Sequence, residues 1–297
     1  MQGEPGQGLL MVDRLAVFGS PIAHSKSPVL HRTAYRLLGL DWEYGSRDVV
    51  AADLPRVVND LDDAWRGLSL TMPLKQVAYD LAGTRDAMAE LTGAVNTLRF
   101  VGTGADRALF GYNTDVAGIT RALGAIGVTE APHVHILGGG ATAASAVVAA
   151  AELGAISVSI LARSPGKSEP LIALGRRAGL TVELVPFEDA ARLQQPQLVI
   201  STLPGGPLPP VSYPASVRSR AALLDVAYEP WPSKLAAMWA DAGSPVANGL
   251  SMLVQQALVQ VRIFAFNDPF QPLEAEEDVL AAMLASAGLD ARGVPSS

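Results

Sequence analysis

The chain has 297 residues, of which 29 are Asp or Glu and 22 are Lys or Arg, so its formal net charge is −7. A length near 300 predicts two domains, and a composition of 49% hydrophobic and 17% charged residues excludes a disordered chain. The acidic balance offers no broad positive field to a nucleic acid. Cysteine is absent, which excludes disulfides and thiolate sites, and we expect no bound metal.

The start of the chain lacks the pattern of a targeting segment. Residues 1–11 lack a basic start followed by a long apolar stretch, and eighteen apolar residues never run uninterrupted. We therefore expect no signal peptide, no membrane contact and a cytoplasmic location. The composition of residues 1–11 and 291–297 predicts that both ends are disordered.

Strand-like and helical stretches alternate in the first part of the chain. The predicted strands are 14–19, 41–49 and 67–72, and the predicted helices are 28–40, 53–65 and 74–82. This alternation is typical of a mainly parallel sheet with helices on its faces. Two further extended segments, 93–100 and 107–113, flank a Gly-rich turn and should form a hairpin or a split pair. A helix over 115–127 follows.

A second alternating series begins at residue 133. A strand over 133–138 is followed by a helix over 139–154 and by strands at 157–163, 181–185, 197–202 and 221–227, the rhythm of a doubly wound nucleotide-binding domain. The helical segments 251–266 and 277–288 have no strand partners and should pack on the first domain. The predicted fold is thus α/β with two domains either side of a cleft: 12–115 completed by 251–290, and 116–250.

The glycine-rich turn "LGGGATAAS" is the candidate cofactor site. Gly138, Gly139, Gly140 and Ala141 lie between a strand and an Ala-rich helix, where small residues allow a tight turn and close approach of a pyrophosphate to the backbone. The helix N-terminus adds free N–H groups and partial positive charge. The alternative is an ordinary tight strand-to-helix turn.

The end of the next strand indicates which dinucleotide binds. A ribose 2′-hydroxyl would be met there by an acidic side chain, but the sequence has Arg163 and Ser164, with Lys167 close behind. Guanidinium and ammonium groups suit a 2′-phosphate, which favours NADP over NAD. The alternative is that these cations form a solvated loop.

Polar residues cluster where the strands of the first domain end. Ser25 and Ser27 follow the first strand, Lys75 follows the third, Asn96 lies in the predicted fourth, and Asp115 begins the linking helix; Ser69 and Thr71 belong to the same set. Ligands of open α/β sheets bind outside the carboxyl ends of strands, so these groups should converge. Each alone could be a helix cap or a solvated residue. Together they suit a small polyhydroxylated acid.

The sequence resembles the shikimate dehydrogenase family. The motifs that carry the resemblance are, in order, "GSPIAHSKSP", "SLTMPLK", "GAVNT", "GYNTD", "LGGGATAASAV", "DVAYEPWPSKL" and "NGLSMLVQQA". The resemblance covers about residues 14–270. It implies reversible NADPH-dependent reduction of 3-dehydroshikimate to shikimate in aromatic amino-acid biosynthesis, with small molecules as the only partners and a monomer or homodimer as the working form.

Residue roles follow from this resemblance. It implies that Lys75 and Asp115 are the catalytic pair, that Ser25 and Ser27 hold the substrate carboxylate with Tyr228 nearby, and that ring hydroxyls contact Thr71, Asn96, Asp115 and Gln256. The cofactor would contact the turn Gly138–Ala141, the Arg163, Ser164 and Lys167 group, Gly249, and Met252 near the nicotinamide.

Two departures from the family pattern leave alternatives open. Ser69 stands where the family commonly has Asn, and Ala162 stands where it more often has Asn before the Arg. The first departure keeps open an NAD-dependent quinate/shikimate dehydrogenase of catabolism, and the second indicates weaker NADP preference. A non-catalytic dinucleotide sensor is a more distant alternative, which the presence of both Lys75 and Asp115 disfavours. A sugar-acid or folate-type dehydrogenase that shares only the cofactor domain is less favoured still.

Overall fold

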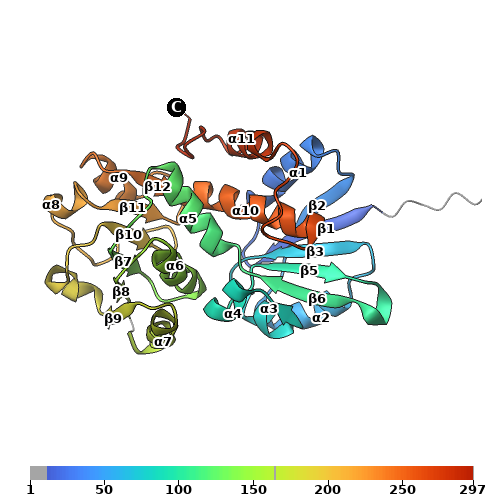
Figure 1. Ribbon diagram of the computed structural model, residues 1–297, viewed down its shortest axis with the longest axis horizontal. Coiled ribbons are helices and arrows are strands. Elements are labelled where there is room, and N and C mark those ends of the chain that lie inside the picture. The colour runs from blue at the N-terminus through green and yellow to red at the C-terminus, as the bar shows by residue number, and fades with distance from the viewer. Residues whose placement is uncertain (1–11, 164, 297) are drawn as a thin grey trace, which may run out of the picture.

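The computed structural model describes residues 12–163 and 165–296, which form two lobes, each built on a six-stranded sheet (Figure 1). The sheet of the first lobe has the order β2-β1-β3-β5-β6-β4. Its strands are β1 (Asp13–Gly19), β2 (Trp42–Asp48), β3 (Trp65–Leu70), β4 (Thr84–Arg85), β5 (Thr97–Val101) and β6 (Ala108–Tyr112). The helices that follow within this lobe are α1 (Ser27–Leu37), α2 (Leu54–Asn59), α3 (Lys75–Leu81) and α4 (Ala87–Thr92).

One strand of the first sheet runs against the others. β5 is antiparallel to β3 and to β6, whereas β1 is parallel to β2 and β3. The short link between β5 and β6 turns at Gly102 and Gly104, both with positive φ, and is too short for a parallel crossover. The predicted hairpin is thus confirmed. The start of β5 therefore lies at the same edge of the sheet as the ends of β1 and β3.

The second lobe has a fully parallel sheet of order β12-β11-β10-β7-β8-β9. Its strands are β7 (His133–Leu137), β8 (Ser157–Leu161), β9 (Thr181–Val185), β10 (Leu198–Ser201), β11 (Ala222–Asp225) and β12 (Val246–Asn248). The remaining helices are α5 (Asp115–Ala125), α6 (Ala141–Glu152), α7 (Pro170–Arg177), α8 (Ala215–Arg218), α9 (Lys234–Ala240), α10 (Gly249–Phe266) and α11 (Glu276–Ser286). This is the predicted doubly wound architecture.

β1 is buried on both faces, which explains its continuous apolar run. Leu15 and Val17 pack with α1, α10 and α11, while Ala16 and Phe18 pack with α2 and α3 on the other side. The alternation follows the two-residue period of a strand. The C-terminal helices thus cover one face of the first sheet.

Helix α10 is the central helix of the molecule and lies beside α5 between the two lobes (Figure 1). It is long and apolar enough to cross a membrane, but 78% of its 18-residue window is buried inside the protein, which is the pattern of a core helix. At Gly118 of α5, an added Cβ would lie 2.9 Å from the carbonyl oxygen of Met252 and 2.8 Å from Cβ of Gln256. The absence of a side chain at Gly118 therefore sets how closely α10 approaches.

Several boundaries differ from the sequence prediction. The helix predicted over 53–65 ends at Asn59, and in the segment beyond it Asp62 accepts the backbone N–H of Ala64. The C-terminal residues 291–296, expected to be disordered, have defined contacts, since Asn248 Nδ2 donates to the carbonyl of Gly293 and Leu289 bridges Pro295. Residues 1–11 and 297 lie outside the described part of the chain. The short elements β4, β12 and α4 were not predicted.

We expect Gly118→Ala to lower the free energy of unfolding by about 1–3 kcal/mol, because the added methyl group forces α5 and α10 apart. Gly124→Ala, in the same helix, is the matched control: an added Cβ meets nothing within 4 Å there, and alanine should be neutral or stabilising by up to about 1 kcal/mol. Urea unfolding of both variants measures the difference. Equal stability of the two variants would contradict the packing argument.

Candidate active site

A cavity of about 180 Å³ opens at the edge of the first sheet where β1 and β3 end. It is lined by ten of the predicted site residues: Ser27, Ser69, Thr71, Lys75, Asn96, Asp115, Tyr228, Gly249, Met252 and Gln256. Two further polar side chains, Thr142 and Gln260, also line it and were not predicted. The convergence of strand-end polar groups is therefore observed.

Asn96 reaches the cavity in a different way from the one expected. It precedes β5 and is not part of a strand. Because β5 is antiparallel, the residue before its first position lies at the same edge as the residues that end β1 and β3. The prediction placed Asn96 at the correct edge of the sheet but assigned it to a strand.

Lys75 and Asp115 form an ion pair in the cavity wall. Lys75 Nζ lies 2.5 Å from Asp115 Oδ2, and the two side chains are only 13% and 6% exposed. Asn96 Nδ2 donates to the other carboxylate oxygen, Oδ1, at 2.8 Å, so both oxygens are held. The ammonium has three N–H donors, of which Asp115 uses one. Lys75 can therefore also donate to an oxygen atom of a ligand in the cavity.

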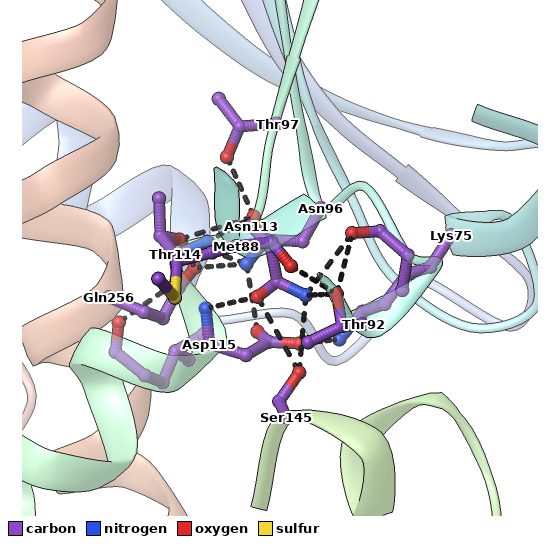
Figure 2. A network of polar contacts seen from close by, with 12 residues as sticks. Lys75, Met88, Thr92, Asn96, Thr97, Asn113, Thr114, Asp115, Ser145 and Gln256 are labelled. Carbon is purple, nitrogen blue, oxygen red and sulfur yellow. Dashed lines mark hydrogen bonds and ion pairs between the residues drawn. The ribbon is translucent and has the colours of Figure 1, made fainter. Parts of the chain in front are cut away.

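The Asn96 amide is the hub of the polar contacts in Figure 2. Its Oδ1 accepts the backbone N–H of Thr114 at 3.0 Å, and its Nδ2 also donates to Gln256 Oε1 at 3.2 Å. Thr114 Oγ1 lies 3.0 Å from the same Gln256 oxygen. Residues from the β5, α5 and α10 regions are thereby joined around one side chain.

Asn113 links the site to the second lobe. Its Nδ2 donates to Thr92 Oγ1 at 2.9 Å and to Ser145 Oγ of α6 at 3.2 Å, and Ser145 approaches from the other lobe in Figure 2. Its Oδ1 accepts the backbone N–H of Asp115 at 2.9 Å, at the start of α5. The same residue therefore orients the catalytic-pair candidate and contacts the second lobe.

The two serines after β1 have different surroundings. Ser27 is buried, is the first residue of α1 and lines the cavity. Ser25 does not line it, because its Oγ turns back to accept the backbone N–H of Ser27 at 3.3 Å. The structure brings Ser27, and not Ser25, together with the rest of the predicted set.

The cavity wall also includes Tyr228 of the second lobe and, at the start of α10, Gly249 and Met252. Burial raises the pKa of Tyr228, so its phenol stays protonated and can donate a hydrogen bond. Gly249 begins α10, and an added Cβ there would lie 1.9 Å from the carbonyl oxygen of Val226, so only glycine fits this crossing. These residues bring the start of α10 to the cavity.

A second cavity of about 250 Å³ adjoins the first and leads to the glycine-rich turn. Both cavities share Thr71, Lys75 and Thr142, and the second is also lined by Gly140, Ala141 and Thr202. Around Gly140 an added Cβ meets no atom within 4 Å, which leaves space beside the start of α6 for a phosphate group. The residues present therefore fit a bound dinucleotide.

The other two glycines of the turn serve its geometry. Gly138 has φ of +113°, and an added Cβ would lie 2.4 Å from Thr202 Oγ1. A Cβ on Gly139 would lie 1.9 Å from Ser168 Oγ. The backbone thus passes close to the segment that follows β8. Arg163 is exposed just after that strand, Ser164 lies outside the described residues, and the placement of the Lys167 side chain is not described.

Residues 12–163 and 165–296 contain no group of three His, Asp or Glu side chains that could hold a metal ion.

A lysine and a carboxylate at the junction of a polar cavity and a glycine-rich dinucleotide turn define a two-domain nicotinamide-dependent oxidoreductase.

The comparisons with known proteins agree with this class. The model of the shikimate dehydrogenase substrate binding domain matches residues 17–98. The NADP⁺ shikimate dehydrogenase of Methanothermobacter thermautotrophicus is 31% identical over 276 residues, which cover 90% of this chain and 95% of that protein. The crystal structure of Mycobacterium tuberculosis shikimate dehydrogenase is 37% identical with a TM-score of 0.77, covering 92% of this chain and 99% of that one.

A further solved structure carries ligands. Shikimate 5-dehydrogenase from Thermus thermophilus, in complex with NADP(H) and shikimate, is 28% identical with a TM-score of 0.74, and the match covers 93% of this chain and all of that one, at 100%. The chain belongs to the shikimate dehydrogenase family.

Asp86 next to the site provides a test of its electrostatics. Its Oδ1 accepts the backbone N–H groups of Ala89, at the start of α4, and of Asn113. Burial raises the pKa of Asp86 to about 6 from its ordinary value of 3.8. The folded state therefore favours the protonated acid, and the stability that this contributes is present below pH 3.8 and is lost as the pH rises through 6.

We expect Asp86→Asn to remove this loss while it keeps an acceptor for both N–H groups. The stability of the variant relative to wild type should increase by up to about 3 kcal/mol between about pH 4 and pH 7. Urea unfolding across this pH range measures it. A stability difference that does not change with pH would contradict the burial of this carboxyl group.

Proposed function

We infer that the protein is an NADP-dependent shikimate dehydrogenase that interconverts 3-dehydroshikimate and shikimate in aromatic amino-acid biosynthesis. The observation that carries this conclusion is the Lys75–Asp115 pair at the junction of the two cavities. In this proposal residues 12–115 with 251–290 bind the substrate, and residues 116–250 bind the cofactor. The protein works in the cytoplasm on small molecules, as a monomer or a homodimer.

Reduction of a ring ketone leaves negative charge growing on its oxygen. NADPH supplies the hydride for this reaction when it is bound. Lys75 then stabilises the developing charge and delivers a proton to the oxygen. Asp115 holds the Lys75 ammonium in place and accepts a hydrogen bond from a neighbouring ring hydroxyl. Asn96 holds Asp115 in turn through its second carboxylate oxygen.

The polar side chains of the cavity suit the other substituents of the substrate. Ser27 and Tyr228, in the cavity wall, receive its carboxylate. Ser25, at the adjoining turn, joins them only when its Oγ leaves the backbone N–H of Ser27. The ring hydroxyls contact Thr71, Asn96, Asp115 and Gln256. Hydroxyl and amide groups can both donate and accept, as binding of a polyhydroxylated ring requires.

The second cavity would hold the cofactor. The backbone from Gly138 to Ala141 would receive the pyrophosphate, and Gly249 and Met252 would contact the nicotinamide. Arg163, Ser164 and Lys167 would contact the 2′-phosphate. Two observations support a 2′-phosphate at this position: no acidic residue directly follows β8 in the sequence, and Arg163 is exposed.

We expect Lys75→Ala to lower kcat for shikimate oxidation by about 100-fold or more, since general acid–base groups contribute on this scale. KM for shikimate should change less than about threefold, because several other groups bind the ring. Steady-state kinetics with NADP⁺ measure both constants. Lys234→Ala, which removes an exposed lysine at the start of α9, is the control. A large rise in KM with kcat preserved would assign Lys75 to binding alone.

Arg163→Ala should raise KM for NADP⁺ by about 10- to 100-fold, the scale of a hydrogen bond to a charged phosphate. KM for NAD⁺, which has no 2′-phosphate, should stay within about twofold. Arg220→Ala removes another exposed arginine of the same lobe and serves as the control. Equal effects of Arg163→Ala on the two cofactors would rule out contact with the 2′-phosphate.

A further inference from the structure

We propose that Tyr44 and Gln260 are positioning residues that fix the Ser69 hydroxyl as a hydrogen-bond acceptor toward the cavity. This point of the cavity then selects a ligand hydroxyl over a carbonyl, ether or carboxylate oxygen. The inference deepens the proposed function, on which it rests, because it concerns the recognition of one ring substituent of the same substrate.

The donors and acceptors of this network can be assigned from one backbone N–H group, which can only donate. The backbone N–H of Thr114 donates to Asn96 Oδ1, which fixes that atom as the carbonyl oxygen of the amide. Thr97 Oγ1 lies 2.9 Å from the same oxygen and must donate its only hydrogen to it. Thr97 Oγ1 is then left as an acceptor.

Gln260 takes its orientation from Thr97. Its Nε2 lies 2.9 Å from Thr97 Oγ1 and 3.2 Å from the carbonyl oxygen of Asn96, so both amide hydrogens have acceptors. Its Oε1 consequently points the other way, where Ser69 Oγ lies at 2.8 Å. The Ser69 hydrogen is thereby committed to Gln260.

The contacts of His31 are consistent with this orientation of the Gln260 amide. His31 Nε2 lies 3.2 Å from Gln260 Oε1, and His31 Nδ1 lies 3.0 Å from the hydroxyl of Tyr35. Burial lowers the pKa of His31 to about 3, so the ring is neutral and carries one hydrogen. That hydrogen must lie on Nε2 to meet the glutamine oxygen, and Tyr35 donates to Nδ1.

Tyr44 completes the arrangement at Ser69. Its hydroxyl lies 2.6 Å from Ser69 Oγ and must donate, since the Ser69 hydrogen is already used. The Tyr44 ring stacks on His31 with centroids 4.0 Å apart and planes at 7°, which holds the hydroxyl in place. A serine oxygen has two lone pairs, of which Tyr44 takes one. The other is available to the cavity, which Ser69 lines.

Ser69 can therefore receive a ligand hydroxyl that donates, but it offers no hydrogen to a carbonyl or carboxylate oxygen. Tyr44, Tyr35 and His31 do not line the cavity, so any effect of Tyr44 on the ligand must act through Ser69. Asparagine at position 69, common in the family, has both a donor and an acceptor in its amide and would lack this selectivity.

The test is a double-mutant cycle on shikimate binding, measured by titration calorimetry, with kcat as a second readout. Tyr44→Phe should raise the Kd for shikimate by about three- to tenfold, and Ser69→Ala by about tenfold. In the Ser69→Ala background, Tyr44→Phe should have less than a twofold effect, because the group it positions is gone. kcat should stay within about twofold in Tyr44→Phe, since Tyr44 does not line the cavity and Lys75 and Asp115 are untouched. Tyr35→Phe, which removes a hydroxyl that does not contact Ser69, is the matched control and should leave Kd unchanged.

Three monodeoxy analogues of shikimate, each lacking one ring hydroxyl, provide a second measurement on wild type and Ser69→Ala alone. One analogue should bind wild type about tenfold more weakly than shikimate does, and this penalty should disappear in Ser69→Ala. Additive effects in the cycle, or penalties that are the same in both proteins, overturn the inference while shikimate binding and oxidation still support the proposed function. Absence of shikimate binding to wild type would overturn the proposed function and the inference with it.

Discussion

The backbone N–H of Thr114 fixes the side-chain amide of Asn96, and much of the cavity's polar wall takes its direction from that contact. Asn96 holds the carboxylate of Asp115 and also contacts Gln256. An amide reversed at Asn96 would place a carbonyl oxygen against the Asp115 carboxylate, and two acceptors buried together are costly. The orientation of the polar side chains in the site thus depends on one backbone N–H group, that of Thr114, which can only donate.

Two close backbone contacts, at Gly118 and Gly249, bring the polar residues of α10 to this cavity. Gly118 lets α10 approach α5, and Gly249 lets the start of α10 pass beside the backbone that follows β11. Helix α10 follows the strands of the second sheet in the chain, but it packs on the first sheet. It therefore places Met252, Gln256 and Gln260 in the cavity at the edge of the first sheet. The Asn113–Ser145 contact adds a polar link between the lobes.

Local patterns were sufficient to predict the two sheets and the polar cluster, because strand periodicity, glycine-rich turns and strand-end hydroxyls are local features. The antiparallel β5 was only partly predictable, since the short turn indicated a hairpin but not the residue at which β5 begins, so Asn96 was assigned to the strand that it precedes. Gln260 was missed because it lies in an apolar helix, although its spacing of four residues from Gln256 indicates the same helix face. The turn of Ser25 away from the cavity depends on how α1 begins, which no residue pattern specified. Residues that act through tertiary contacts, such as Tyr44, could not be recognised before the packing was known.

We conclude that this cavity and this turn serve shikimate and NADP together. The most direct test of this conclusion is the initial rate of cofactor reduction by the purified protein with shikimate and with quinate, each combined with NADP⁺ and with NAD⁺. We expect turnover with shikimate and NADP⁺ that clearly exceeds the other three combinations. Preference for quinate with NAD⁺ would contradict this conclusion, and would identify Ser69 and Ala162, the two departures from the family pattern, as residues that change the choice of substrate and cofactor.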